Sequence, residues 1–285
     1  MGKIALSWTL VMKSLSILAS DKELILLPMV SSFLSFLAAA ALYGWYFASN
    51  WDSIQAARAQ GLTGLPYPVL FYLLTFIFYV ISYFVVDFCN VALIAVANNR
   101  MAGGHWKMRD GLALAWERSG TIFQWAVFAA TVGMILRIIS ERVGFLGRIV
   151  TGLVGLTWSL AIYFIVPVLA FDNLGPIDAV KRSAKLFRET WGENVAAGVS
   201  FGLIFGVPLF FGVGLLKLRL LPMGFHSIAA TIAVVLDLLF LQFTSAVCSA
   251  AWSIFNVALY NYALSGAVHG GFSADDFQSA WVPKS

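Results

Sequence analysis

Long apolar runs, separated by short polar segments, dominate the pattern of the chain. A helix that crosses a membrane needs about 20 mostly apolar residues. We predict six such helices, which cover residues 24–47, 67–99, 119–136, 149–171, 194–216 and 227–267. Four of these runs contain no charged residue, whereas the second contains Asp87 and the sixth contains Asp237.

Three shorter segments are amphipathic, with apolar residues on one helical face and polar or basic residues away from it. They cover residues 4–20, 106–118 and 177–190, and this pattern is typical of helices that lie in the membrane surface. Each segment precedes two apolar runs. We therefore predict a single all-α domain over residues 1–285, a polytopic membrane helix bundle in which each of three hairpins follows an amphipathic helix. A short tail helix is expected at 273–282.

The composition supports a membrane protein and excludes several soluble classes. Hydrophobic residues make up 60% of the chain and charged residues only 11%, whereas about a quarter of a typical soluble domain is charged. A soluble enzyme, a disordered chain and a disulfide scaffold are all excluded. The two cysteines lie in apolar runs without metal-ligand spacing, and no common catalytic motif occurs. We predict no cofactor, no metal site and no enzymatic activity.

The distribution of Lys and Arg predicts the orientation of the helices. With six spans, twelve of the 18 bases fall on the side of the N-terminus, the second and fourth loops and the C-terminus, against six on the other side. Bases concentrate in cytoplasmic loops, so both termini are expected in the cytoplasm and the protein in the cytoplasmic membrane. The net charge of +4 is too small to indicate a nucleic-acid partner. Anionic lipid head groups are the expected partners, bound through Lys181, Arg182, Lys185 and Arg188.

Part of the first hairpin recurs in the third. NVALIAVANNRMAGG, from Asn90, matches NVALYNYALSGAVHG, from Asn256, at six of fifteen positions. Transporters built from repeats place their sites at discontinuous helices near the midplane. Pro28, Pro167 and Pro208 predict kinks or helix boundaries, but no pair of half-helices is recognisable in the sequence. A structural role is therefore favoured over transport.

Four polar residues inside the predicted spans are candidates for an intramembrane site: Asp87, Asn90, Gln242 and Asn256. An intramembrane carboxylate is costly and indicates function by default. Asp87 could line a polar cavity, or it could pair with a neighbouring helix, and the sequence leaves both open. Gln242 and Asn256 belong to a polar seam in which packing is more common than conduction.

Three glycines of the fifth predicted span, Gly198, Gly202 and Gly206, recur at four-residue spacing and predict close helix packing. Their partner could be another helix of this chain or a second copy, which leaves a homo-oligomer open.

Three stretches carry a family resemblance: WTLVMKSLSILASDKELILLP from Trp8, PVLAFDNLGPIDAVKRSAKLFRETWGEN from Pro167, and FSADDFQSAWVPK from Phe272. They resemble a group of bacterial and archaeal six-span proteins catalogued as domain of unknown function 6159. A weaker likeness is to the membrane domain attached to some glycerophosphodiester phosphodiesterases, without their catalytic domain. The resemblance implies a topology and a membrane location but no activity.

The leading hypothesis is thus a non-enzymatic multipass membrane protein with a structural, membrane-organising or accessory role. The alternative is a small transporter or channel with a polar intramembrane site around Asp87.

Overall fold

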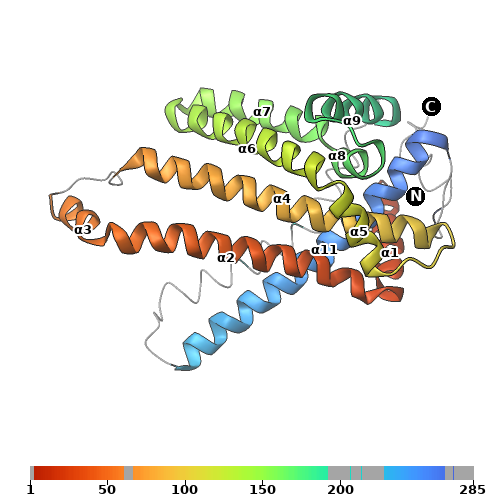
Figure 1. Cartoon of the computed structure of the whole chain (residues 1–285), viewed down its shortest axis with the longest axis horizontal. Helices are drawn as coiled ribbons and strands as arrows, with labels where there is room; N and C mark the ends of the chain where they lie inside the picture. Colours follow the sequence, from red (N-terminus) through yellow and green to blue (C-terminus); the bar gives the residue numbers. More distant parts are fainter. Residues whose placement is uncertain are drawn as a thin grey trace.

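The fold is a bundle of helices, and its long axis runs roughly along the helix Pro68–Met101 (Figure 1). The computed structural model describes residues 3–60, 67–191, 206, 213, 228–266 and 272. Every element in these ranges is helical, and none of the described residues forms a strand. The all-α prediction is therefore confirmed for the part of the chain that the structure describes.

Four helices are long and apolar enough to cross a membrane, and their ranges are Lys22–Ser49, Pro68–Met101, Ser119–Arg142 and Ile232–Ser265. In the first, the 3-10 turn η1 (Lys22–Ile25) leads into α2 (Leu26–Ser49). The others are α4 (Pro68–Met101), α6 (Ser119–Arg142) and most of α11 (Ile228–Ser265). α2, α4 and α6 run side by side, whereas α11 crosses the bundle obliquely (Figure 1).

The predicted span 149–171 is a broken helix. α7 (Phe145–Ala161) is followed by the one-turn helix α8 (Ile165–Pro167) and by the π-helical turn η2 (Val168–Asp172). The two parts meet at an angle of 43°, so they form either one bent span or a re-entrant segment. The sequence predicts a kink at Pro167 but not a discontinuous pair of half-helices, and the structure corrects that expectation.

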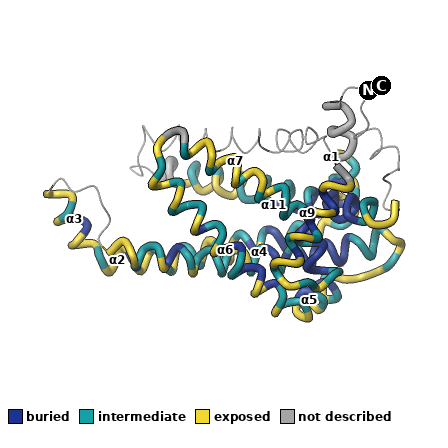
Figure 2. The backbone as a smooth tube through the Cα atoms, turned by 90° about the horizontal axis from the view of Figure 1, so that it is seen from above, coloured by how far each residue is buried: buried dark blue, intermediate teal, exposed yellow. Residues whose placement is uncertain are grey.

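Three short helices lie together at one end of the bundle: α1 (Lys3–Ser20), α5 (Met108–Glu117) and α9 (Pro176–Trp191) (Figures 1 and 2). We call this end the basic end. Their ranges agree closely with the three predicted amphipathic segments. At the opposite end lies α3 (Trp51–Ala59), a short helix that the sequence analysis did not predict.

The buried core is concentrated at the basic end (Figure 2). Residues 91–97 of α4 are all 2% exposed or less, because α5, α6, η2 and α11 surround this part of the helix. Elsewhere α2, α7 and α11 expose large apolar side chains, including Phe36, Leu153 and Phe240. Exposed apolar surface on this scale fits contact with lipid rather than water.

Some predicted features lie outside the described residues. These are nearly all of the fifth span, 194–216, with Gly198 and Gly202, and also the tail helix 273–282. Gly206 is described and exposed, and a Cβ atom built on it would meet no described atom within 4 Å. The described residues therefore contain four helices that could cross a membrane, or five candidate spans if the bent pair counts as one, and six spans stay a prediction.

Candidate functional site

The break between α7 and α8 follows from Pro167. A proline has no N–H to donate, and its ring clashes with the carbonyl group four residues earlier, which here belongs to Tyr163. The chain turns more tightly instead, with the Ile165 N–H donating to the Ile162 carbonyl oxygen at 2.9 Å. This leaves backbone polar groups without their usual helical partners.

Side chains from two other helices bind those backbone groups. The Nδ2 atom of Asn256, on α11, donates to the Tyr163 carbonyl oxygen at 3.0 Å. The backbone N–H of Phe164 donates to the Oγ atom of Ser183, on α9, at 2.9 Å. Both side chains are buried. Irregular backbone at membrane depth is tolerated only where protein or water satisfies it, and here the protein does so.

A second polar cluster lies at the end of η2. The Asp172 carboxylate accepts hydrogen bonds from the Tyr260 hydroxyl at 2.9 Å and from Arg182 Nε at 3.2 Å. Arg118 Nε donates to the Ala170 carbonyl oxygen at 3.3 Å. These contacts tie η2 to α9, to α11 and to the junction between α5 and α6. Arg182, a predicted lipid-binding residue, therefore makes an internal ion pair.

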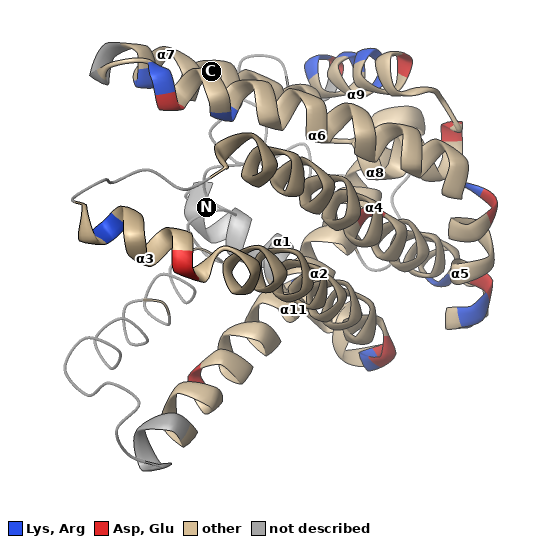
Figure 3. Ribbon diagram, turned by 60° about the vertical axis from the view of Figure 1, so that its left-hand side comes forward, with Lys and Arg blue, Asp and Glu red and all other residues tan. Residues whose placement is uncertain are grey.

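The other three predicted lipid-binding residues lie on the exposed side of α9. Lys181 pairs with Asp178 at 3.1 Å, and Lys185 approaches Glu189 at 3.8 Å. Exposed pairs of this kind contribute little free energy and leave both groups accessible. Arg188 is exposed and makes no ion pair with any described residue. Figure 3 shows these charges on α9, at the basic end.

Asp87 belongs to α4 and is buried where this helix packs against α6. The residue is 8% exposed, and its carboxylate accepts a hydrogen bond from the Trp125 indole N–H at 2.9 Å. Trp125 is also buried and stacks on Trp158, with ring centroids 6.1 Å apart. The sequence left open whether Asp87 lines a cavity or pairs with a neighbouring helix, and the structure gives it a partner on a neighbouring helix, the Trp125 indole.

The other three candidates face different neighbours. Asn90 is half-buried and makes no side-chain hydrogen bond with a described residue. Gln242 lies beside α2, and its Nε2 atom is buried without a hydrogen-bond partner among the described residues. Asn256 binds the helix break. Asp87, Asn90, Gln242 and Asn256 therefore do not share one hydrogen-bonded cluster.

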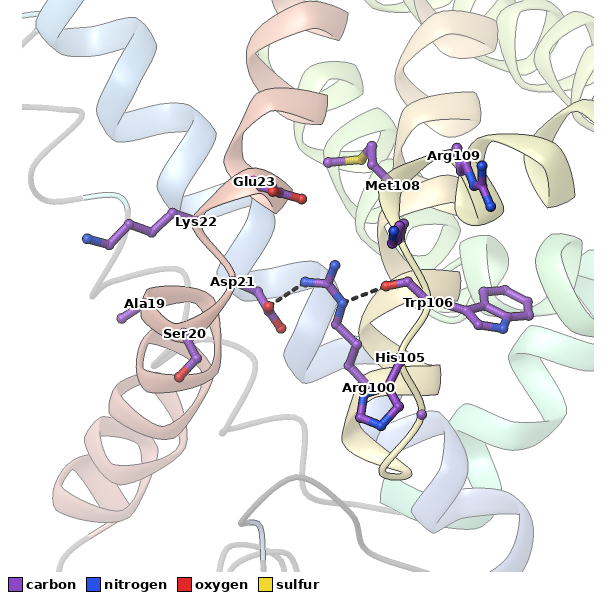
Figure 4. Close-up of a pocket in the computed structure, with 12 residues that line it drawn as sticks. Ala19, Ser20, Asp21, Lys22, Glu23, Arg100, His105, Trp106, Met108 and Arg109 are labelled. Carbon is purple, nitrogen blue, oxygen red and sulfur yellow. Dashed lines mark hydrogen bonds and ion pairs between the residues drawn. The ribbon is translucent and has the colours of Figure 1, made fainter.

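A cavity of about 970 Å³ opens at the basic end, and we call it the end pocket. Its walls are residues 19–23, from the turn between α1 and α2, together with Arg100 and residues 104–109, from the connection between α4 and α5 (Figure 4). Neither wall was singled out as a site by sequence reasoning. The available signal was the recurrence of bases in both connections.

Hydrogen bonds fix the wall that α4 contributes. Arg100 forms an ion pair with Asp21, and its Nε atom donates to the Trp106 carbonyl oxygen at 2.8 Å (Figure 4). The Trp106 N–H donates to Asn99 Oδ1 at 3.1 Å. Gly103 makes the turn possible because its φ of +85° is a conformation that few other residues adopt. Hydrogen bonds therefore order one wall of the end pocket, and the Arg100–Asp21 ion pair joins it to the other wall.

The comparison with protein families finds a match. A family model with the description "Family of unknown function (DUF6159)" matches residues 69–272, a range that begins in α4 and includes the helix break and α11. No curated protein and no solved structure matches the chain. The likeness to the membrane domain of glycerophosphodiester phosphodiesterases is not shown. Because the match covers well over half of the sequence, the chain belongs to the family of unknown function DUF6159.

Proposed function

We propose that this chain is a non-enzymatic multipass protein of the cytoplasmic membrane that organises anionic lipid around its basic end. In this proposal both termini lie in the cytoplasm. The observation that carries it is the position of α1, α5 and α9 at one end of the bundle, together with most of the bases of the described residues (Figures 1 and 3).

Electrostatics connects this arrangement to lipid. Each Lys or Arg near an anionic membrane surface contributes about 1 kcal/mol of attraction. Lys181, Lys185 and Arg188 are exposed on α9, next to the densest packing in the bundle. A rigid helix that presents three bases at the membrane surface can gather anionic head groups without any chemical step.

The polar groups inside the bundle support a packing role. Asp87 binds Trp125, Asn256 binds the Tyr163 carbonyl oxygen, and Asp172 binds Tyr260. Each of these hydrogen bonds joins two helices that are distant in the sequence. Hydrogen bonds of this kind stabilise membrane helix bundles.

The test is the lipid preference of the full chain. We would purify the protein in mild detergent and measure the ratio of phosphatidylglycerol to phosphatidylcholine that it retains from an equal mixture. The variant Lys181→Gln/Lys185→Gln/Arg188→Gln should lose most of the preference, while Arg182 stays in place because it binds Asp172. The matched control removes three bases at the opposite end, Arg58→Gln/Arg142→Gln/Arg148→Gln, and should keep the preference. A wild-type protein without any preference for phosphatidylglycerol would contradict the proposal.

A second candidate function is transport through the bundle, and the helix break favours it. Discontinuous helices form the substrate sites of many secondary transporters, and η2 carries Asp172 next to the break. The test is ion or solute flux in proteoliposomes with Asp87→Asn and Asp172→Asn. Flux that either variant abolishes would support transport, and flux that neither variant changes would count against it.

A further inference from the structure

An apolar groove lies on the outer surface of the bundle between α2, α4 and α5. Its volume is about 460 Å³. The groove lies between Leu26 and Val30 of α2, Phe84 and Phe88 of α4, and Leu112 and Trp116 of α5. We call it the α5 groove. It leads away from the basic end toward the middle of the bundle.

The α5 groove and the end pocket share a wall. Met108, the first residue of α5, lines both of them. A molecule with a polar head and an apolar chain could therefore occupy the two at once, with the head beside Arg100 and the chain under α5. Figure 4 shows Met108 at the edge of the end pocket, opposite Glu23.

The charges of the end pocket favour a phosphate group. Arg100 is occupied by Asp21, but Lys22 and Lys107 are exposed and make no ion pair within the described part of the chain. Arg109 is 83% exposed and only approaches its neighbour Asp110, at 3.5 Å. Glu23 is the one acidic residue of the pocket outside the Arg100–Asp21 pair. Three accessible bases against one acid leave an excess of positive charge, which the single negative charge of a phosphodiester would reduce.

We propose that the end pocket and the α5 groove together bind one glycerophospholipid. The phosphodiester lies in the end pocket, between the turn that carries Lys22 and the segment that carries Lys107 and Arg109, and one acyl chain lies in the α5 groove. The second chain passes across Leu26 and Val30, because these two residues also line a groove of about 640 Å³ between α2 and α11. The basic end would then carry a bound lipid in addition to the lipid attracted by α9.

The length of the α5 groove suits an acyl chain. On α2 it extends from Leu26 to Leu34, which at 1.5 Å per residue is about 12 Å. One leaflet of a hydrocarbon core about 30 Å thick is about 15 Å deep. A chain that starts at the end pocket can therefore follow the groove through most of one leaflet.

The seating of α5 on α4 gives the groove a fixed shape. A Cβ atom at Gly111 would overlap the Ala92 carbonyl oxygen and the Val96 side chain, so only glycine allows this approach. One turn further along, the exposed ring of Trp116 packs edge-on against Phe88, with centroids 6.5 Å apart. The groove is thus a formed surface feature beside the polar pocket.

This proposal depends on the membrane location in the proposed function but not on the bases of α9. The two can therefore be tested apart. Native mass spectrometry of the detergent-purified full chain, titrated with dioleoylphosphatidylglycerol, measures a one-to-one complex directly. Glycerol 1-phosphate and dioleoylglycerol serve as probes for the head without chains and for the chains without phosphate.

The expected results are specific to the site. Lys22→Ala/Lys107→Ala should weaken phosphatidylglycerol binding by about thirtyfold, from two lost contacts to a phosphate. Leu112→Trp, which fills the groove, should weaken it by about tenfold or more because the acyl chain loses buried methylenes. Val30→Phe is a second groove variant on a different helix, should Leu112→Trp fail to fold. The matched control Lys181→Ala/Lys185→Ala, on α9, should change this binding by less than about twofold.

Several outcomes would overturn the proposal. One is the absence of a one-to-one complex with the wild-type chain. Another is a loss in the α9 control equal to that in Lys22→Ala/Lys107→Ala, which would indicate adsorption to charge in general. Tight binding of glycerol 1-phosphate would indicate a site for free phosphate esters, and tight binding of dioleoylglycerol would indicate contact with apolar chains alone. If the α9 variant of the lipid-preference test kept its preference for phosphatidylglycerol while this complex formed as expected, only the proposed function would be contradicted.

Discussion

The first and the last turns of α4 have different surroundings, although they belong to one helix. Residues 91–97 are at most 2% exposed, whereas Val69 is 81% exposed and Leu73 is 54% exposed. At the basic end α4 is enclosed by protein on all its faces, and we call this the enclosed end. At the α3 end, the open end, Leu74 and Thr75 are still buried, but other faces of the helix are exposed. Both stretches are apolar in sequence. Hydropathy therefore identifies the helix but does not say which part of it contacts lipid.

The comparison also explains where the irregular backbone lies. The break between α7 and α8 occurs at the enclosed end, within reach of Asn256 and Ser183. At the open end the same carbonyl and N–H groups would face hydrocarbon, at a cost of several kcal/mol each. A dense core at one end of a membrane bundle thus makes a local departure from the α-helix possible.

The largest expected effect tests the packing at the enclosed end. Gly111→Ala should lower the free energy of unfolding in mixed micelles by about 2 to 3 kcal/mol, because the new methyl group overlaps the backbone of α4. The control is Gly155→Ala on α7, where a Cβ atom meets nothing within 4 Å. Equal losses of stability from the two substitutions would contradict the claim that the enclosed end is packed more tightly than the rest of the bundle.

A somewhat smaller effect is expected at the buried carboxylate. Trp125→Phe should destabilise the bundle by about 2 kcal/mol, since Asp87 loses its hydrogen-bond donor while it stays buried. Adding Asp87→Leu should recover part of that loss, because no unpaired carboxyl group then remains. Thermal melting of the four proteins of this cycle measures the coupling, and strictly additive effects would show that the indole does not stabilise Asp87.

The helix break should respond to Asn256→Ala with a loss of about 1 kcal/mol, typical of a hydrogen bond between membrane helices. In a Pro167→Ala background residue 167 has an N–H that can bind the Tyr163 carbonyl oxygen. Asn256→Ala should therefore cost less there, and a hydrogen–deuterium exchange experiment on residues 160–170 should show slower exchange. The same cost in both backgrounds would mean that Asn256 does not compensate for the proline.

The smallest effect is expected at the open end. Glu141 accepts a hydrogen bond from Tyr72 at 2.6 Å and pairs with Arg137 at 2.9 Å. Glu141→Gln should change the stability by less than about 0.5 kcal/mol, because exposed ion pairs contribute little. A loss as large as that of Trp125→Phe would show that the open end is also held together by polar contacts.

The sequence predicts helices better than it predicts contacts between them. The long apolar runs correctly predicted helices at 24–47 and 67–99, and helices also lie at the three segments predicted to be amphipathic, since both patterns depend only on nearby residues. α3 was missed because its composition is that of a polar loop. Pro167 marked the position of the break. The size of the break could not be predicted, because it depends on whether Asn256 and Ser183 reach it in three dimensions.

The candidate site shows the same limit. Asp87 was recognised as an intramembrane carboxylate, but its partner Trp125 is 38 residues away and belongs to another helix. Arg182 was predicted to contact lipid, and only the fold shows that it binds Asp172. The end pocket joins two connections that are about 80 residues apart in the chain. The sequence shows bases in both connections but does not show that the two connections meet.

The orientation of the two ends can be measured directly by cysteine labelling in intact cells. In a chain with Cys89→Ser and Cys248→Ser, one cysteine is introduced at exposed Lys107 of the basic end or at exposed Gln60 beside α3. We predict that a membrane-impermeant maleimide labels the Gln60→Cys protein in intact cells and the Lys107→Cys protein only after the membrane is opened. Labelling of Lys107→Cys in intact cells, with Gln60→Cys protected, would contradict a cytoplasmic basic end.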